Sequence, residues 1–181
     1  MNPISQEFAP PFKLIAPFFK IGVAFYLLSM LFLTTFTSEN LLALDTKVLA
    51  LAHLFLLGFV MMIIFGAMAQ LVPVVLEVGH AAVELFYAIW PLLAIGTVLM
   101  VGGFLHFPIM LPFGGIIVLV SMSIFIAEIF ATIKKVEDLD VVMTSVLVSN
   151  LFLAFGIVVG FVMSLGYAGV AAVDVSALLK S

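Results

Sequence analysis

The sequence lacks two residue types on which much protein chemistry depends. None of its 181 residues is cysteine, so disulfides, Cys-ligated zinc, iron–sulfur clusters and thiol catalysis are excluded. Arginine is also absent. All six basic residues are lysines, so the bidentate forks that commonly bind phosphates and carboxylates are missing. With 9% charged residues, a net charge of −4 and no basic patch, the chain is not expected to bind nucleic acid.

Apolar residues dominate the composition of the chain. They make up 66% of the chain, and the mean hydropathy is +1.43. A soluble domain of this size could not cover so much apolar surface with polar groups. The sequence therefore predicts an integral membrane protein surrounded by the lipid bilayer, all-α and polytopic, with a single transmembrane helical domain over residues 1–181. The expected location is the cell's inner (cytoplasmic) membrane.

Apolar runs separated by short polar turns predict about five transmembrane helices. The second run is long enough to tilt or to project beyond the hydrocarbon. The expected spans are about 14–37, 48–78, 85–106, 113–133 and 141–168.

The lysines favour an orientation with the N-terminus inside and the C-terminus outside, because cytoplasmic loops carry an excess of positive charge. In that orientation the inner side has Lys13, Lys20, Lys134 and Lys135, and the outer side has Lys47 and Lys180.

His53 is the most informative residue. It lies a few residues inside the start of the second span, where an imidazole in hydrocarbon should face a partner, a cavity or a metal rather than lipid. His106 ends the third span, so the helical hairpin should bring it to the same side of the membrane as His53. His80, 27 residues after His53, should lie on the opposite side. A shared ligand would therefore involve His53 and His106 only.

Gly102 and Gly103 lie about one turn before His106. Small residues beside a ligating histidine leave room for a flat macrocycle, and they equally allow close helix packing. Both interpretations stay open from the sequence.

The pattern His53-x4-Gly58-x7-Gly66-x3-Gln70-x2-Pro73 resembles the second transmembrane helix of heme-copper oxidase subunit I and of the related nitric oxide reductases and NnrS-type haem proteins. The resemblance covers about 30 residues clearly and the preceding span loosely. In that family the histidine near the outer end of this helix is an axial ligand of the low-spin haem. The resemblance therefore implies that His53 is an axial ligand of haem b, with Gly58 in the same motif.

The departures from the family limit what the resemblance implies. A haem–copper binuclear centre needs more histidines than the three in this chain, and the family's subunit has many more helices. The arginines that usually pair with haem propionates are missing, which leaves Lys47 as the nearby cation. The sixth iron position would come from His106, from a second subunit or from a methionine, or would stay open. Thioethers can ligate haem iron or Cu(I), but in membrane helices methionine more often serves packing.

Other polar groups lie inside apolar segments. Lys20 and Glu128 both fall near the expected inner face and could pair across helices, or Glu128 could carry protons. Gln70 and Asn150 are the expected polar contacts between helices. The pair Gly156 and Gly160 has small-xxx-small spacing, which fits either packing within the chain or the seam of a homodimer.

The leading hypothesis is a homodimeric haem b membrane protein. His53 would be the axial ligand and His106 the candidate second ligand. It would act in one-electron transfer, with a redox protein or quinol as partner, or in binding a diatomic gas. The alternative is a cofactor-free assembly partner or small-solute carrier, in which His53 is a hydrogen-bonded interior residue and transport depends on Gln70 or Asn150.

Overall fold

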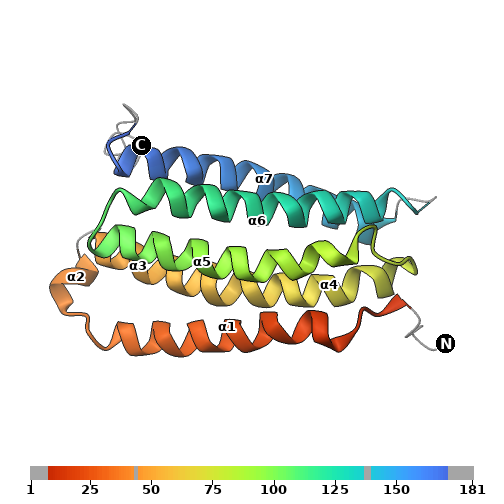
Figure 1. The fold of residues 1–181 in the computed structure, drawn as a ribbon, viewed down its shortest axis with the longest axis horizontal. Helices are drawn as coiled ribbons and strands as arrows, with labels where there is room; N and C mark the ends of the chain where they lie inside the picture. The colour runs from red at the N-terminus through yellow and green to blue at the C-terminus, as the bar shows by residue number, and fades with distance from the viewer. Residues whose placement is uncertain (1–7, 43–44, 137–139, 171–181) are drawn as a thin grey trace.

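The computed structural model describes residues 8–42, 45–136 and 140–170. In this part of the chain five helical rods are long and apolar enough to cross a membrane, and they run alternately up and down one axis (Figure 1). The predicted all-α membrane bundle is confirmed, and each predicted span overlaps one of these rods. The elements are α1 (Phe12–Leu33), α2 (Ser38–Leu42), α3 (Thr46–His53), η2 (Leu54–Met61), α4 (Met62–Leu76), η3 (Val83–Leu85), α5 (Phe86–Leu105), α6 (Met110–Ile133) and α7 (Val141–Tyr167).

The second rod is continuous from Thr46 to Leu76 but is not a uniform α-helix. It begins where the Asp45 side chain accepts a hydrogen bond from the Lys47 backbone N–H, an N-cap that also holds the pKa of the Asp45 carboxyl below its usual value. Immediately after His53 the backbone widens into the eight-residue π-helix η2, and it returns to α-helix at Met62. π-Helical turns are rare and frequently occur at functional sites.

The rods form three layers (Figure 1). Helix α1 lies along one side and packs on η2 and α4. The rod α3–η2–α4 and α5 form the middle, and α6 and α7 form the other side, with α5 packed on α6 and α7 packed on α6.

The tightest helix crossing joins α5 to α6. A Cβ added at Gly114 would lie 2.8 Å from the Met100 backbone nitrogen, and one added at Gly96 would lie 3.1 Å from the Gly114 carbonyl oxygen. The two backbones can approach this closely because neither glycine has a side chain. The Ser121 hydroxyl donates across the same pair to the Ile89 carbonyl, at 2.9 Å. Helices α5 and α6 are therefore the most closely packed helix pair of the described bundle.

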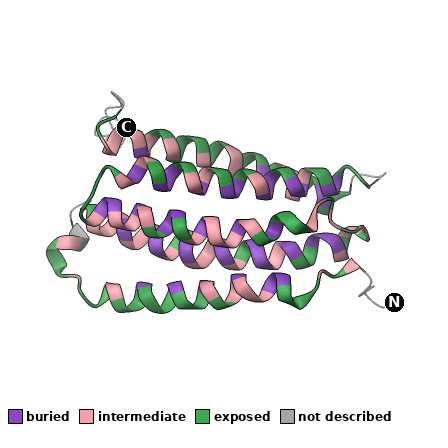
Figure 2. Cartoon of the chain, in the orientation of Figure 1, coloured by how far each residue is buried: buried purple, intermediate pink, exposed green. Residues whose placement is uncertain are grey.

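Helix α7 is the least buried rod (Figure 2). Only 6% of its most apolar segment is buried, against 28–44% for the other four rods. It touches α6 closely at Gly115, where a Cβ would lie 2.7 Å from the Ser164 hydroxyl oxygen. Much of α7 is left without a neighbouring helix, and this leaves space between α7 and the η2–α4 rod.

Because successive rods run in opposite directions, every second connection lies at the same end of the bundle. The start of α3, the end of α5 and the end of α7 lie at one end, and the α4–α5 loop and the start of α7 lie at the other (Figure 1). His53 and His106 therefore share one end and His80 lies at the opposite end, as the span lengths predicted. Lys180, used in the orientation argument, lies outside the described residues.

Candidate functional site

His53 has one ring nitrogen engaged and one free for a ligand. Its Nδ1 lies 2.8 Å from the Leu49 carbonyl oxygen, one turn earlier on the same rod. A carbonyl oxygen only accepts, so Nδ1 must carry the proton, and in the neutral imidazole Nε2 then has the lone pair. Within the described residues Nε2 has no hydrogen-bond partner. Metal-ligating histidines usually have this arrangement, with the second N–H held by a carbonyl or carboxylate.

The half-buried His53 ring is held in place by its neighbours. It lies against the Phe104 ring of α5, with centroids 4.8 Å apart, and Phe104 in turn meets the Tyr167 ring edge-on at 5.8 Å. Phe104 of α5 therefore contacts the His53 ring directly, and Tyr167 of α7 in turn supports Phe104.

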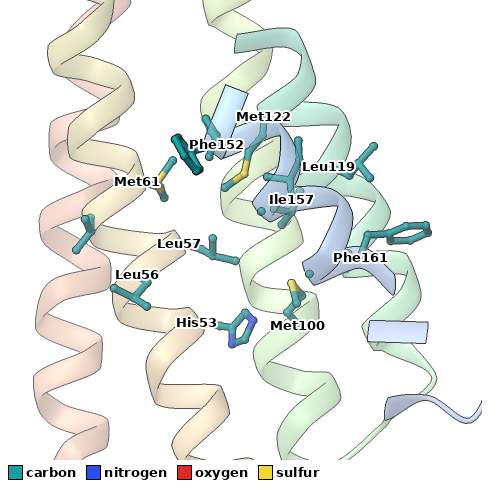
Figure 3. A pocket seen from close by; sticks show the side chains of 16 residues that line it. His53, Leu56, Leu57, Met61, Met100, Leu119, Met122, Phe152, Ile157 and Phe161 are labelled. Atoms are coloured by element: carbon teal, nitrogen blue, oxygen red, sulfur yellow. The ribbon is translucent and has the colours of Figure 1, made fainter. Parts of the chain in front are cut away.

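Next to the ring is a cavity of about 450 Å³, which we call the His53 cavity. Figure 3 shows His53 and Met100 toward one end of it, and Met61, Met122 and Phe152 toward the other. Its lining comes from the second rod, α5, α6 and α7: His53, Leu56, Leu57, Val60, Met61, Met100, Gly115, Val118, Leu119, Met122, Phe152, Leu153, Gly156, Ile157, Gly160 and Phe161.

Two glycines of α7 open into this cavity. A Cβ added at Gly156 or Gly160 would meet no atom within 4 Å. The small-xxx-small pair does not serve close packing within the described chain; that role belongs to Gly96 and Gly114. Gly156 and Gly160 instead enlarge the His53 cavity on its α7 side.

The atoms that line the His53 cavity restrict its chemistry. The lining offers one imidazole and the thioethers of Met61, Met100 and Met122, and it contains no charged side chain. In the described residues no three His, Asp or Glu side chains gather in a way that could hold a metal ion. The cavity therefore suits an apolar group with few polar contacts, and it does not suit a hydrated metal ion.

The structure does not bring the other predicted site residues to this cavity. His106 is exposed, because α5 ends at Leu105 and the backbone leaves helical geometry at His106 (φ −139°). Gly103 and Gly58 serve packing: a Cβ at Gly103 would lie 2.7 Å from the Leu111 side chain, and one at Gly58 would lie 2.6 Å from the Phe25 ring. The nearest atom to a Cβ at Gly102 is the Met110 sulfur, at 3.6 Å.

Lys47 is occupied elsewhere. Its Nζ donates to the Thr35 carbonyl at 2.7 Å and lies 4.8 Å from the centroid of the Phe36 ring. It closes the α1–α3 connection, and it is not among the residues that line the His53 cavity.

The opposite end of the bundle contains a buried polar pair that the sequence did not predict. Glu128 does not pair with Lys20, whose side chain is exposed. Instead, His80 Nδ1 lies 3.0 and 3.1 Å from the two Glu128 carboxylate oxygens, with both side chains almost fully buried. Glu128 Oε1 also accepts from the Ala81 N–H at 3.0 Å and from the Thr132 hydroxyl at 2.8 Å.

The second nitrogen of His80 explains this pairing. His80 Nε2 lies 2.6 Å from the Ala69 carbonyl oxygen. In an α-helix that carbonyl would accept from residue 73, but Pro73 has no N–H, so His80 supplies the missing donor. Because Nε2 must donate, one further proton is shared between Nδ1 and Glu128, and the pair is neutral overall. Pro73 and a carboxylate in an apolar helix were the signals that could have predicted this pair.

Comparisons with known proteins identify no relative: no protein-family model, no curated protein and no solved structure matches this chain.

Proposed function

We propose that this polytopic membrane protein binds haem b in the His53 cavity, where His53 Nε2 would hold the iron. The observation that carries the proposal is the free Nε2 beside an apolar cavity, on a ring whose Nδ1–H is already held by the Leu49 carbonyl. This is the tautomer that haem ligation requires, and the helix fixes it before any ligand binds.

The residues that line the His53 cavity fit haem. Pockets for bound organic ligands usually have volumes of about 300–1,000 Å³ and mostly apolar walls with few polar contacts. The His53 cavity, at about 450 Å³, is within this range. Gly156 and Gly160 leave the α7 wall without side chains, where a Cβ would reduce the space. The lining provides no cation for the haem carboxylates, so the iron–His53 bond would be the main polar contact.

Each residue has a defined task in this proposal. The Leu49 carbonyl and the Phe104 ring orient His53, and the apolar walls would exclude water from a bound haem. Met61, Met100 and Met122 are the other cavity residues with an atom that can ligate iron. When bound, haem supplies one-electron redox chemistry if its sixth position is filled and binding of a diatomic gas if that position is open.

The likeness of the second rod to heme-copper oxidase subunit I and NnrS-type proteins supports the same ligand. It is consistent with a place in the inner (cytoplasmic) membrane. His106, exposed and outside the cavity, is not part of the proposed site in one chain.

The test is purification from membranes supplied with haem, followed by oxidised and dithionite-reduced spectra and pyridine haemochrome quantitation. We expect stoichiometric haem b in the wild type and in His106→Ala, and loss of the Soret band in His53→Ala. Carbon monoxide added to the reduced protein would then separate an open sixth position, which shifts the spectrum, from a filled one.

A second variant separates loss of the site from loss of the fold. Gly160→Leu places a side chain in open space inside the cavity, so it should block haem while the thermal unfolding midpoint of the apoprotein stays unchanged. A folded wild-type protein that stays colourless with excess haem would refute the proposal. The cofactor-free assembly partner or small-solute carrier would then take its place.

A further inference from the structure

A groove between α1 and α5 lies at the end of the bundle where both of these helices begin (Figure 1). Its volume is about 440 Å³, and we call it the Lys20 groove. No described residue lines both this groove and the His53 cavity, so the two are separate. The lining of the groove consists of two lysines and a tryptophan, Lys13, Lys20 and Trp90, with Phe12, Ala16, Pro17 and Ile21.

The two lysines lie on one face of α1, and both are exposed. They are seven residues apart, which is almost two full turns, so about 10 Å along the helix axis separates their Cα atoms. Side chains on a helix lean toward its N-terminus. The long side chain of Lys20 therefore leans toward Lys13 and toward the end of the bundle.

The depth of Lys20 makes its charge costly without a partner. Lys20 lies eight residues after Phe12, the first residue of α1, about 12 Å along the helix. Helix α1 has 22 residues and is about 33 Å long, hardly more than the hydrocarbon core of about 30 Å that it has to cross. The Cα atom of Lys20 therefore lies below the headgroups, and its ammonium is stable only if it reaches up to them or meets an anion.

Neither lysine has an anionic partner in the described part of the chain. The ion pair found there joins His80 to Glu128, and the described residues that line the Lys20 groove include no Asp or Glu. Two ammonium groups that share one groove repel each other, and an anion between them attracts both. The charges of the groove therefore favour an anionic ligand.

Trp90 forms the α5 wall of the groove. It is the single tryptophan of the chain, it is half-buried, and it lies four residues after Phe86, where α5 begins. Tryptophan is enriched at the level of the lipid headgroups, where its ring meets both hydrocarbon and water. Trp90 therefore indicates that the groove opens at the boundary between headgroups and acyl chains.

We propose that the Lys20 groove binds an anionic phospholipid, with the lipid phosphate between the ammonium groups of Lys13 and Lys20 and the acyl chains along the apolar wall. A free phosphate ion would supply the same charge but would leave the apolar wall uncovered. In the orientation that the lysines predict, the groove faces the cytoplasmic leaflet, which carries the anionic lipids. This inference does not depend on haem binding, since it uses a separate set of residues.

The fluorescence of Trp90 provides the measurement, because no other tryptophan contributes to it. The full chain is reconstituted in vesicles of phosphatidylcholine with increasing fractions of phosphatidylglycerol, and one of the two lipids carries bromine on its upper acyl chains. Bromine quenches tryptophan at contact, so the quenching curves give the relative affinity of the two lipids beside Trp90. We expect the wild type to prefer phosphatidylglycerol at least about tenfold, because each lysine near an anionic lipid contributes a factor of about five.

Removal of the lysines should remove the preference. Lys20→Gln should lower it about fivefold, and the double variant Lys13→Gln/Lys20→Gln should abolish it, with the affinity for phosphatidylcholine unchanged. Both lysines are exposed, so the thermal unfolding midpoint and the unquenched emission maximum should stay at their wild-type values.

Lys134→Gln is the matched control. Lys134 directly follows α6 at the same end of the bundle and is exposed, but it does not line the groove. The substitution makes the same change in net charge, and we expect the wild-type preference to remain.

Equal quenching by the two lipids in the wild type, or a preference that survives the double variant, would overturn the proposal. Equal losses in Lys20→Gln and Lys134→Gln would also overturn it, because they would come from the overall charge of this membrane face. Loss of the preference in sodium phosphate, but not in sodium chloride of the same ionic strength, would assign the groove to free phosphate instead. The Soret band tests the haem proposal separately, and none of these lysine variants should change it.

Discussion

At the scale of single residues, the hydrogen bonds of two histidines assign them different tasks. Among the described residues His53 bonds through Nδ1 only, so its other nitrogen remains available to a ligand. Both nitrogens of His80 are bonded, to Glu128 and to the Ala69 carbonyl, so it cannot ligate without breaking the contacts that hold the α4–α5 loop. Lys135 supports that loop by donating to the carbonyls of Gly79 and His80.

The His80–Glu128 pair should be essential for stability. His80→Leu leaves a buried carboxylate without its main partner, which typically costs about 3–5 kcal/mol. The measurement is the free energy of unfolding in detergent at neutral pH.

The double variant His80→Leu/Glu128→Leu provides the control. It should be more stable than His80→Leu, because no charge stays buried and the Ala81 N–H keeps its bond to Thr132. It should remain below wild type, because the Ala69 carbonyl still lacks a donor. If the double variant is as unstable as the single one, the cost does not come from the unpaired carboxylate.

At the scale of elements, glycines with the same sequence pattern have different roles. Gly114 lies in backbone contact with α5, whereas Gly160 faces open space. The spacing of small residues indicates where a close crossing can form. Only the position of the neighbouring helix decides whether it does.

A matched pair of substitutions tests this difference. Gly114→Ala should destabilise the bundle by about 1–3 kcal/mol, because its Cβ would overlap backbone atoms that cannot move independently. Gly160→Ala should leave the thermal midpoint unchanged or slightly raise it, since alanine is the better helix former. Equal losses in both variants would mean that α7 also packs closely at Gly160, as in a dimer seam.

The end of α4 stores local strain. Glu77 adopts the left-handed conformation (φ 53°). This conformation turns the chain so that the Val78 N–H donates to the Pro73 carbonyl. Glycine takes this conformation without steric cost, so Glu77→Gly should stabilise the protein by about 0.5–1 kcal/mol. Thermal unfolding would show it as a raised midpoint, and a lowered midpoint would mean that the Glu77 side chain makes a compensating contact.

At the scale of the whole molecule, the placement of α7 creates two cavities beside it. Helices α1 to α6 form the packed part of the bundle, and α7 adds a wall that meets it mainly through α6. His53 lines the cleft that remains near one end, and Asn150 lines it farther along. A ligand or a second copy of the chain would complete the packing of α7.

The orientation in the membrane can be tested cleanly because the chain has no native cysteine. The lysine distribution predicts that the α1–α3 connection lies outside and the α4–α5 loop inside. In intact cells, an impermeant maleimide should therefore label Ser38→Cys and spare Gly79→Cys. Both sites are exposed, so labelling in permeabilised cells controls for access. The reverse pattern would place the N-terminus outside.

The sequence by itself determined the membrane class, the number of spans and the end of the bundle that each histidine occupies. These follow from hydropathy and helix rise, which act along the chain. It also singled out His53, because a polar group in an apolar run is visible without coordinates. The tertiary structure alone decided the partner of Glu128, the separation of His106 from the cavity, and the meeting of Trp90 with Lys20 in one groove. Each of these depends on which helix faces which, and the contacts between helices have no period along the sequence. The π-helix after His53 was likewise visible only in the tertiary structure, since an apolar run of this composition is equally compatible with a regular α-helix.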